Sequence, residues 1–498
     1  MENILPIHIQ EVIFSSSDTK ISKQISKLEK EGKIIKIAPR IYTSNLKETA
    51  ESIVQRNLFQ ILAHLYPDAL LSHRSAFEYK PTATGTIFLT YTYTKKVNLP
   101  GVTISFLKGN RAIDGDNVIA GKLFVSQQER ALLENLQSSK RPGADSKTLS
   151  IPEIEDKLEQ IIRVHGEDGL NKIRDKAKAI SEQLNMDSEF LKLNKIISSL
   201  LSTKPSKVLK SPLALARAFG VPYDPERLTL FENLFRELKQ KEFPNYSEKN
   251  MSRKSFRNFA FFESYFSNYI EGTIFELDDA KKIIATQTPI PARDEDSHDV
   301  LGTYQLVSNQ DEMQITPKSP EELLQILLYR HKILLSVRLN KNPGQFKDKN
   351  NRAGQTHFVD LNLVRGTLMK GFEFSSGLTH PFAKAIYMMF MISEVHPFLD
   401  GNGRIARVMM NAELVKEKQS KIIIPTVFRD DYMGALKKLT KQGDAETYIR
   451  MMERAREFSQ NIHNEDMDLM EKYLDNCEAF KEHTEGKLKI VPRNSFLK

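Results

Sequence analysis

The stretch that decides the fold of the C-terminal half is Pro381-Phe-Ala-Lys-Ala-Ile-Tyr-Met-Met-Phe-Met-Ile-Ser-Glu-Val395, followed by His396-Pro-Phe-Leu-Asp-Gly-Asn-Gly-Arg-Ile-Ala-Arg407. The first part is almost wholly apolar and opens with a proline, which predicts a buried helix. The proline after the histidine ends that helix. The Asp-Gly-Asn-Gly sequence then predicts a tight turn with unusual backbone dihedrals, and we expect a new helix to begin near Arg404.

This turn has the residue types of a phosphate site. Backbone N–H groups at a helix N-terminus, flanked by Arg404 and Arg407, form an anion site. Asp400 is placed to hold Mg²⁺ that bridges phosphate oxygens. His396 is placed to accept a proton from an attacking hydroxyl. A lone glycine turn or a lone histidine is usually structural, but a plain turn needs neither the histidine nor the pair of arginines.

The segment resembles the signature of the Fic family, His-x-Phe-x-Asp/Glu-Gly-Asn-Gly-Arg-x-x-Arg, and fills every defined position. The resemblance implies an all-helical Fic domain and transfer of AMP from ATP to Ser, Thr or Tyr hydroxyls of a target protein. It implies that His396 is the general base and that Asp400 binds Mg²⁺. The implied phosphate ligands are Gly401, Asn402 and Gly403 for the α- and β-phosphates, Arg404 for the β-phosphate region, and Arg407 for the γ-phosphate.

The family also has a β-hairpin flap before the motif, and residues 350–359 fit it in position and composition. We expect Thr356, His357 and Phe358 to offer an exposed edge to which a target segment adds as a strand. A plain interhelical loop is the alternative. Three residues lie where the family lines its adenine pocket, although aromatic side chains on helices usually only pack. They are Asp431, Tyr432 and Gln442.

An acidic residue upstream of the motif resembles a built-in inhibitor. Ser267 and Glu271 are four residues apart and share a helical face, and Gly272 predicts the helix end. In a Fic protein this pattern resembles the inhibitory helix, Ser/Thr-x-x-x-Glu-Gly/Asn. The resemblance implies that Glu271 pairs with Arg407 and takes the place of the γ-phosphate, so that ATP binds unproductively. The alternative is an ordinary solvated helix face.

The N-terminus is predicted to form a helix, a turn, a basic helix that ends at Gly32, and a short hairpin. Residues 21–42 resemble the start of AbiEi-type antitoxins, with a winged helix-turn-helix, and Leu71-Ser-His-Arg-Ser-Ala76 resembles their second segment. This predicts duplex DNA as a partner, with Ser22, Gln24 or Ser26 near base edges. Phosphate contacts are predicted for the basic residues Lys20, Lys23, Lys27, Lys30 and Arg40. A solvated lysine face on a protein-docking module is the alternative.

The fold class is predicted as mainly α, with an α+β N-terminal region. We expect a helix over 51–66 and two strands, 87–93 and 102–106, joined by a turn at Asn98-Leu-Pro-Gly101. The predicted order of domains is a winged helix-turn-helix (1–50), an α+β extension (51–140), a helical segment (151–202), a linker (203–225), the Fic domain (226–460) and a charged helical tail (461–498).

Composition agrees with a globular protein. The 498 residues are 40% hydrophobic and 27% charged, with a modest net charge of +8. The single cysteine, Cys477, excludes an intramolecular disulfide, and we expect a cytoplasmic protein without a secretory signal or membrane helix. The sequence leaves open whether the protein forms a homodimer. Two other functions also stay open: removal of AMP on the same fold, and a transcriptional regulator that uses the Fic domain as a nucleotide sensor.

Overall fold

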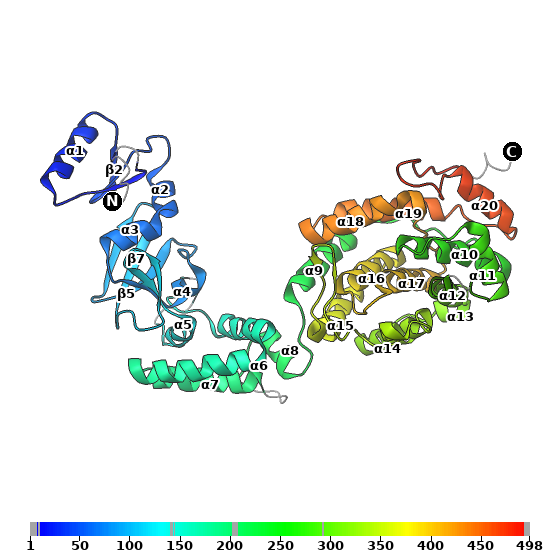
Figure 1. Cartoon of the computed structure of the whole chain (residues 1–498), viewed down its shortest axis with the longest axis horizontal. Helices are drawn as coiled ribbons and strands as arrows, with labels where there is room; N and C mark the ends of the chain where they lie inside the picture. Colours follow the sequence, from blue (N-terminus) through cyan, green and yellow to red (C-terminus); the bar gives the residue numbers. More distant parts are fainter. Residues whose placement is uncertain are drawn as a thin grey trace. The chain divides into compact units, whose positions relative to one another are not determined.

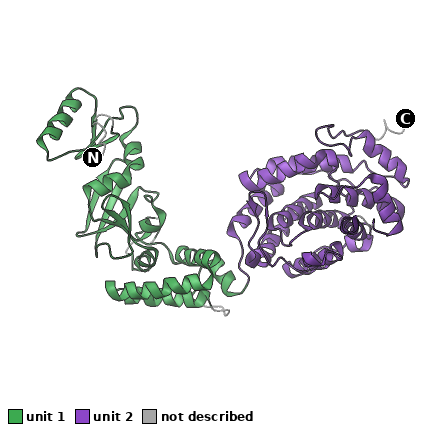
Figure 2. Ribbon diagram, viewed as in Figure 1, with its two compact units in different colours: residues 1–220 green, residues 221–498 purple. Residues whose placement is uncertain are grey.

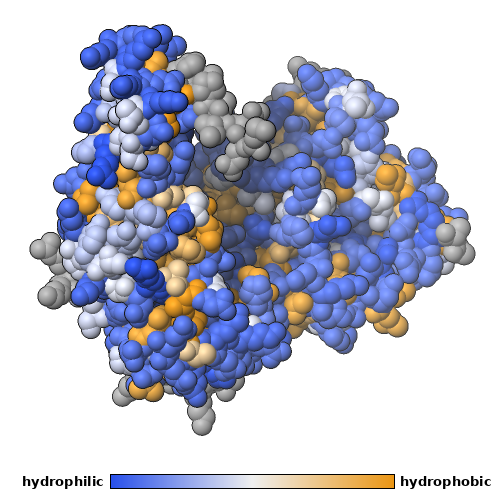
Figure 3. Space-filling view, turned by 60° about the vertical axis from the view of Figure 1, so that its left-hand side comes forward, coloured by the Kyte–Doolittle hydropathy of each residue, from blue (hydrophilic) through white to orange (hydrophobic). Residues whose placement is uncertain are grey.

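The chain forms two compact units, residues 1–220 and 221–498, each with its own hydrophobic core (Figures 1 and 2). The computed structural model describes residues 7, 10–139, 143, 145–201, 208–290 and 293–492. The second unit is helical and the first combines helices with β-sheet, which confirms a mainly α chain with an α+β N-terminal region. The face in Figure 3 is largely hydrophilic. None of the described helices is long and apolar enough to cross a membrane.

The extreme N-terminus combines one helix with a small sheet of order β1-β3-β2. Asp18 caps α1 (Thr19–Lys30) by accepting hydrogen bonds from two backbone N–H groups. The strands are β1 (Val12–Phe14), β2 (Ile35–Ala38) and β3 (Ile41–Thr43). The helix predicted at the start of the chain, before the turn and the basic helix, is wrong for residues 12–14, which form β1. These β-branched and aromatic residues pair with β3, and Val12 and Ile13 are buried.

A six-stranded mixed sheet follows, of order β6-β7-β5-β4-β9-β8. Its strands are β4 (Leu70–Leu71), β5 (Thr86–Tyr91), β6 (Lys95–Leu99), β7 (Val102–Lys108), β8 (Asn117–Ala120) and β9 (Leu123–Val125). The helices of this part are α2 (Ala50–Arg56), α3 (Leu58–Leu65), α4 (Arg74–Glu78) and α5 (Gln128–Asn135). The helix predicted over 51–66 is broken at Asn57. The turn at Pro100–Gly101 joins β7 to β6 rather than to β5, and β5 and β7 run parallel.

Two long helices pack beside α5. Helix α6 (Ile151–Leu184) has a kink at Gly166, where φ is 69°, and α7 (Asp187–Leu200) returns along it. Residues 203–207 of the predicted linker lie outside the described residues. Residues Pro212–Ala218 form α8, which packs on α6 through buried Ala214 and Ala218. The predicted linker is therefore too long, because its alanines and leucines form an apolar helix face.

The second unit is a helical bundle around one core. Its α-helices are α9 (Pro225–Gln240), α10 (Arg253–Ile270), α11 (Leu277–Thr286), α12 (Asp294–Val307), α13 (Gln310–Met313), α14 (Pro320–Leu334), α15 (Val364–Ser375), α16 (Pro381–Val395), α17 (Asn402–Lys416), α18 (Arg429–Gln442), α19 (Ala445–Ser459) and α20 (Met467–Asn476). Helices α16 and α17 lie side by side in the middle (Figure 1). The C-terminal segment is not a separate tail, because Met470 and Leu474 of α20 are buried in the same core.

Candidate functional site

The motif loop connects α16 to α17 through two residues in left-handed conformations. His396 is the C-cap of α16, with φ 52° and ψ 60°, and Gly401 is the N-cap of α17, with φ 73°. Helix α17 begins at Asn402, two residues before the predicted start. Glycine allows the turn at 401 without steric cost. The N-terminus of α17 therefore faces the same space as the histidine ring at the end of α16.

Asn402 holds the loop from inside. Its side chain accepts a hydrogen bond from the Phe398 N–H (2.8 Å) and donates one to the Phe398 carbonyl (2.9 Å). Asn351 donates to the same carbonyl at 2.8 Å. Because Asn402 is 2% exposed and uses both ends of its amide this way, its side chain fixes the loop shape. The anion site near it would be made by backbone groups.

A histidine that sequence reasoning missed supports the loop from the other side. The ring of His331 stacks on Phe398 with centroids 3.8 Å apart. Its Nδ1 accepts from the Gly344 N–H at 3.0 Å, so its Nε2–H donates to the Asp400 carbonyl at 3.2 Å. Burial lowers the pKa of His331 to about 4, so the ring stays neutral. No local pattern distinguishes this histidine from an ordinary core residue.

His396 has the form that a general base requires. Its Nδ1–H donates to the Ser393 carbonyl at 3.1 Å, which leaves the lone pair on Nε2. The ring stacks on Phe358 at 3.6 Å between centroids. Burial lowers the pKa of His396 to about 4, and the nearby Lys347 ammonium acts in the same direction. The imidazole is therefore neutral near pH 7.

Asp400 is ionised, and its two carboxylate oxygens differ in their contacts. Its Oδ1 accepts from the Gly401 N–H at 2.6 Å and lies 3.3 Å from Arg404, while the one contact of Oδ2 among the described residues is Lys341 at 3.7 Å. Burial alone would raise the pKa of Asp400, but Arg404, the Gly401 N–H and Lys341 bring it below its ordinary value. One carboxylate beside a phosphate site suits Mg²⁺, which takes few protein ligands and several phosphate or water oxygens. The described residues hold no cluster of three or more metal-ligating side chains.

Arg404 points into a buried network rather than into open space. It pairs with Asp299 at 2.8 Å, and Arg338 binds the same carboxylate at 2.7 Å. Asn268 accepts from Arg404 at 3.4 Å. Arg404 is 2% exposed and does not line the pocket described below, whereas its predicted role was at the β-phosphate region. Asp299 was not predicted, because it lies 105 residues away in the sequence, on α12.

Arg407 is bound by Ser267 and Glu271, the two residues of the segment whose sequence resembles an inhibitory helix. Its Nη2 pairs with Glu271 at 2.7 Å and donates to the Ser267 carbonyl at 2.8 Å, while its Nε donates to Ser267 Oγ at 3.0 Å. Ser267 lies in the last turn of α10, and Glu271 is its C-cap. A Cβ added at Gly403 would collide with the Glu271 carboxylate. Glu271 therefore lies directly over the first turn of α17.

A pocket of about 770 Å³ opens in front of these groups, a size typical of small-molecule sites. Motif residues in its wall include His396, Gly403 and Arg407, and Glu271 also faces it. Helix α18 supplies the far wall with Asp430, Tyr432, Met433, Gly434, Leu436, Lys437, Thr440 and Lys441.

Only one of the three residues predicted for the adenine pocket lines this pocket. Tyr432 does and is buried, but Asp431 and Gln442 are exposed and do not. Successive side chains on a helix are turned by about 100°, so an error of one residue along α18 moves a side chain out of the pocket wall. The neighbour of Tyr432 that does reach the wall is Met433, together with Asp430 two residues earlier.

The predicted flap is a two-stranded hairpin, β10 (Arg352–Ala353) with β11 (Thr356–His357). Thr356 and Phe358 line the pocket, and His357 is exposed. Arg227, near the start of α9, donates to the His357 carbonyl at 2.6 Å and pairs with buried Glu394 at 2.8 Å. Arg227 thereby ties the hairpin to the helix that carries His396, a link that sequence reasoning did not foresee.

The basic residues predicted to contact DNA are exposed on the surface of the first unit. All four lysines of α1 are exposed, while Ile25 and Leu28 are buried on the other side. Lys27 lies 3.8 Å from Glu31, which also pairs with Lys33. Arg40 stands exposed in the turn between β2 and β3, with φ 68°. Glu31 reduces the positive charge of this surface.

Residues 321–414 match the model of the Fic/DOC family, so the chain carries a Fic domain. The chain is 27% identical over 212 residues to protein adenylyltransferase Fic of Drosophila willistoni, covering 41% of this chain and 42% of that protein. The protein of the same name from Drosophila persimilis is 27% identical over 205 residues, with 38% and 37% covered. The chain thus spans about two fifths of the length of these curated relatives.

Solved Fic proteins are similar at low identity. Fic-1 from C. elegans is 17% identical with a TM-score of 0.36, covering 66% of this chain and 89% of that chain. A Fic domain containing signaling protein from Bacteroides thetaiotaomicron is 14% identical with a TM-score of 0.36, covering 50% and 97%. The resemblance of the N-terminal region to AbiEi-type antitoxins stays a prediction.

Proposed function

We propose that the second unit transfers AMP from ATP to hydroxyl side chains of a target protein. One observation carries this proposal: a neutral His396, the N-terminus of α17 at Gly403, and Arg407 face a single pocket. The match to the Fic/DOC family and the adenylyltransferase relatives point to the same reaction. A pocket of this kind offers a base, an anion site and room for a nucleotide.

In the proposed reaction a target hydroxyl oxygen attacks the α-phosphorus of ATP. Nε2 of His396 takes the hydroxyl proton, a new oxygen–phosphorus bond forms, and the bond to pyrophosphate breaks. N–H groups at the start of α17 stabilise the negative charge on the phosphate oxygens. Mg²⁺, held by Asp400, would neutralise part of the phosphate charge. Phe358 keeps the imidazole in place by stacking on it.

We infer that the resting enzyme is inhibited by Glu271. Its carboxylate uses the guanidinium of Arg407 and covers Gly403, which are the positive groups that triphosphate oxygens would need. A triphosphate cannot share this position with a carboxylate, because like charges repel at close range. ATP would then bind with its α-phosphate away from His396, so transfer is slow until Glu271 moves.

The opposite reaction is a second candidate, favoured by the same carboxylate. Glu271 and His396 line one pocket, so Glu271 is placed to orient a water molecule for hydrolysis of an AMP–protein bond. In that case Glu271→Gly would abolish the activity rather than raise it.

For the first unit we propose duplex DNA as the partner, through the exposed lysines of α1 and Arg40 at the hairpin turn. These side chains are exposed among the described residues, and the positive charges of the four lysines share one face of α1. A mobility shift of residues 1–220 with duplex DNA that weakens as salt rises would support it, and no shift at low salt would refute it.

The experiment that tests the proposed reaction is labelling with ATP that carries the label in the α-phosphate. Wild type, His396→Ala and Glu271→Gly are compared, with Glu242→Gly as a control because Glu242 is exposed and far along the chain from the motif. Protein-bound label in Glu271→Gly that disappears in Glu271→Gly/His396→Ala supports AMP transfer. Labelling that survives His396→Ala refutes the catalytic assignment. Loss of label from a pre-labelled protein only when Glu271 is present identifies AMP removal instead.

A further inference from the structure

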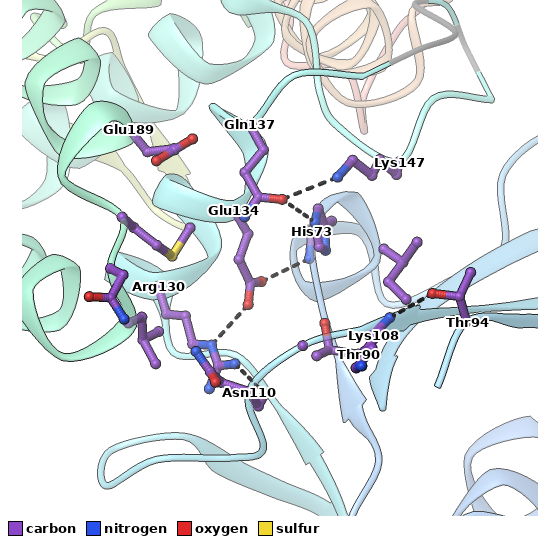
Figure 4. A pocket seen from close by; sticks show the side chains of 15 residues that line it. His73, Thr90, Thr94, Lys108, Asn110, Arg130, Glu134, Gln137, Lys147 and Glu189 are labelled. Carbon is purple, nitrogen blue, oxygen red and sulfur yellow. Dashed lines mark hydrogen bonds and ion pairs between the residues drawn. The ribbon is translucent and has the colours of Figure 1, made fainter. Parts of the chain in front are cut away.

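A second pocket, of about 340 Å³, lies in the first unit and has no part in AMP transfer (Figure 4). Its walls come from the end of β7, helix α5, the segment around Lys147 and the turn between α6 and α7. His73 from the segment Leu71–Ala76 also lines it. This segment was noted in the sequence but has no role in the function proposed above.

The floor of this pocket is a buried set of charges. Arg130 and Glu134 are 2% and 3% exposed and pair at 2.9 Å. Arg130 also pairs with Asp116 at 2.6 Å, and Glu134 accepts from the His73 N–H at 3.0 Å and from Ser126 at 2.9 Å. Burying charges is costly even when they are paired, so a charged layer beneath a concave surface indicates a functional site.

The backbone of His73 is strained, and its ring is held in one state. Its φ of 55° and ψ of −135° are rare for a residue with a side chain. The Nε2–H donates to Gln137 Oε1 at 3.1 Å, and Nδ1 accepts from Ser72 Oγ at 3.0 Å. Burial lowers the pKa of His73, so the ring is neutral. Strain that is kept by such a network is typical of ligand sites.

The wall above this floor offers more donors than acceptors. The side chains of Lys108, Asn110 and Asn185 have no hydrogen-bond partner among the described residues. Within the described part of the chain, the ammonium of Lys147 donates to Gln137 Oε1 at 3.1 Å and to no other side chain. Arg130 pairs with both floor acids and offsets one of their two negative charges. Glu134 and Glu189 act on the Lys147 ammonium from a distance, while Lys108 adds a further positive charge to the wall. The other carboxylate of the wall, Glu189, accepts from Ser188 at 2.8 Å.

We propose that this pocket binds a small phosphate monoester, with its phosphate between Lys108 and Lys147. Lysines and amides match the three acceptor oxygens of a phosphate from separate directions, whereas the only arginine fork in the wall is already occupied. Leu107, Leu184 and Met186 supply an apolar wall for the organic part. Because Lys108 is the last residue of β7 and Met186 lies between α6 and α7, the ligand would join the sheet to the helical hairpin.

Hydrogen exchange of the full chain, read peptide by peptide, tests this site with inorganic phosphate, AMP and succinate. At ten times the Kd we expect about tenfold slower exchange in peptides that cover 105–112 and 184–190, if opening requires release of the ligand. Lys147→Gln and Lys108→Gln should each remove this effect, and Lys122→Gln should not, since Lys122 is exposed and outside the pocket.

Because exchange is measured for each peptide, binding at this pocket is distinguished from binding at the pocket in the second unit. Unchanged exchange elsewhere in the first unit shows that the variants remain folded. The proposal is overturned if neither phosphate nor AMP slows exchange at the pocket, if slowing is confined to residues 396–407, if Lys147→Gln and Lys108→Gln both leave the effect intact, or if succinate protects and phosphate does not.

Discussion

Replacing Glu271 by glycine should activate AMP transfer. The substitution removes the carboxylate that pairs with Arg407 at 2.7 Å and covers Gly403, and it leaves the left-handed Gly272 and the rest of α10 in place. The side chain of Arg407 is 6% exposed and that of Glu271 is 28% exposed, so the pair is only partly screened by water. A hydrogen bond between charged groups of this kind contributes about 1.5–3 kcal/mol.

That energy sets the expected size of the activation. Because about 1.4 kcal/mol corresponds to a factor of ten, freeing Arg407 for the γ-phosphate should raise the rate of labelling roughly 10- to 100-fold. The assay is the initial rate of self-labelling and of labelling of a cell extract with α-labelled ATP. Glu271→Gln is a matched variant that keeps the side-chain volume and loses the charge, and we expect it to fall between wild type and glycine.

One result would refute this reasoning. If Glu271→Gly binds ATP and stays folded, yet labels no faster than wild type, the contact with Arg407 does not restrain the enzyme. If the same variant instead loses an AMP-removing activity that wild type has, the carboxylate serves hydrolysis.

Three further predictions follow from the geometry. Because burial lowers the pKa of His396 to about 4, kcat/KM should stay level as pH falls from 8 to about 5 and decline only near pH 4. A base with the ordinary histidine pKa of about 6.5 would instead lose activity from pH 7 downward. A pH–rate profile of Glu271→Gly distinguishes the two. Asn402→Ala leaves the buried backbone N–H of Phe398, and one acceptor site of its carbonyl, without their partner. The free energy of unfolding measured in urea should therefore fall by about 2–4 kcal/mol. A change under about 0.5 kcal/mol would contradict the structural role of this amide. Arg227→Gln should raise the KM for a protein target and leave the affinity for ATP unchanged, because the substitution removes the hydrogen bond that holds the His357 carbonyl of the flap. An equal loss of ATP affinity would show that Arg227 supports the whole pocket.

Local signals in the sequence were sufficient for the helix ends and the motif. Gly32 follows the end of α1, as predicted, and Asp18 caps its start, since capping involves residues within one turn. The helix before His396 was also correct, because a proline opens it and another closes it. The first strand was missed since three apolar residues have no period, and only pairing with β3 makes them a strand.

The candidate site was found only in part, for a similar reason. His331, Asp299 and Arg227 support the site from other helices, and nothing near them in the sequence marks them. The pocket wall on α18 was misplaced at two of three positions. A helical pattern shows which face is apolar, but the side chains that line a cavity depend on what packs against each face.

The sequence by itself determined the chemistry of the central loop: a histidine, an acid, a glycine turn and two arginines within twelve residues. These groups act through backbone geometry that spans only a few residues, so spacing alone predicts it. The tertiary structure decided which distant groups reach that loop. Glu271 and Arg407 are 136 residues apart and meet because α10 packs against α17, a pairing that only the family resemblance predicted. Such a contact arises from the packing of whole helices, which no local pattern of residues encodes.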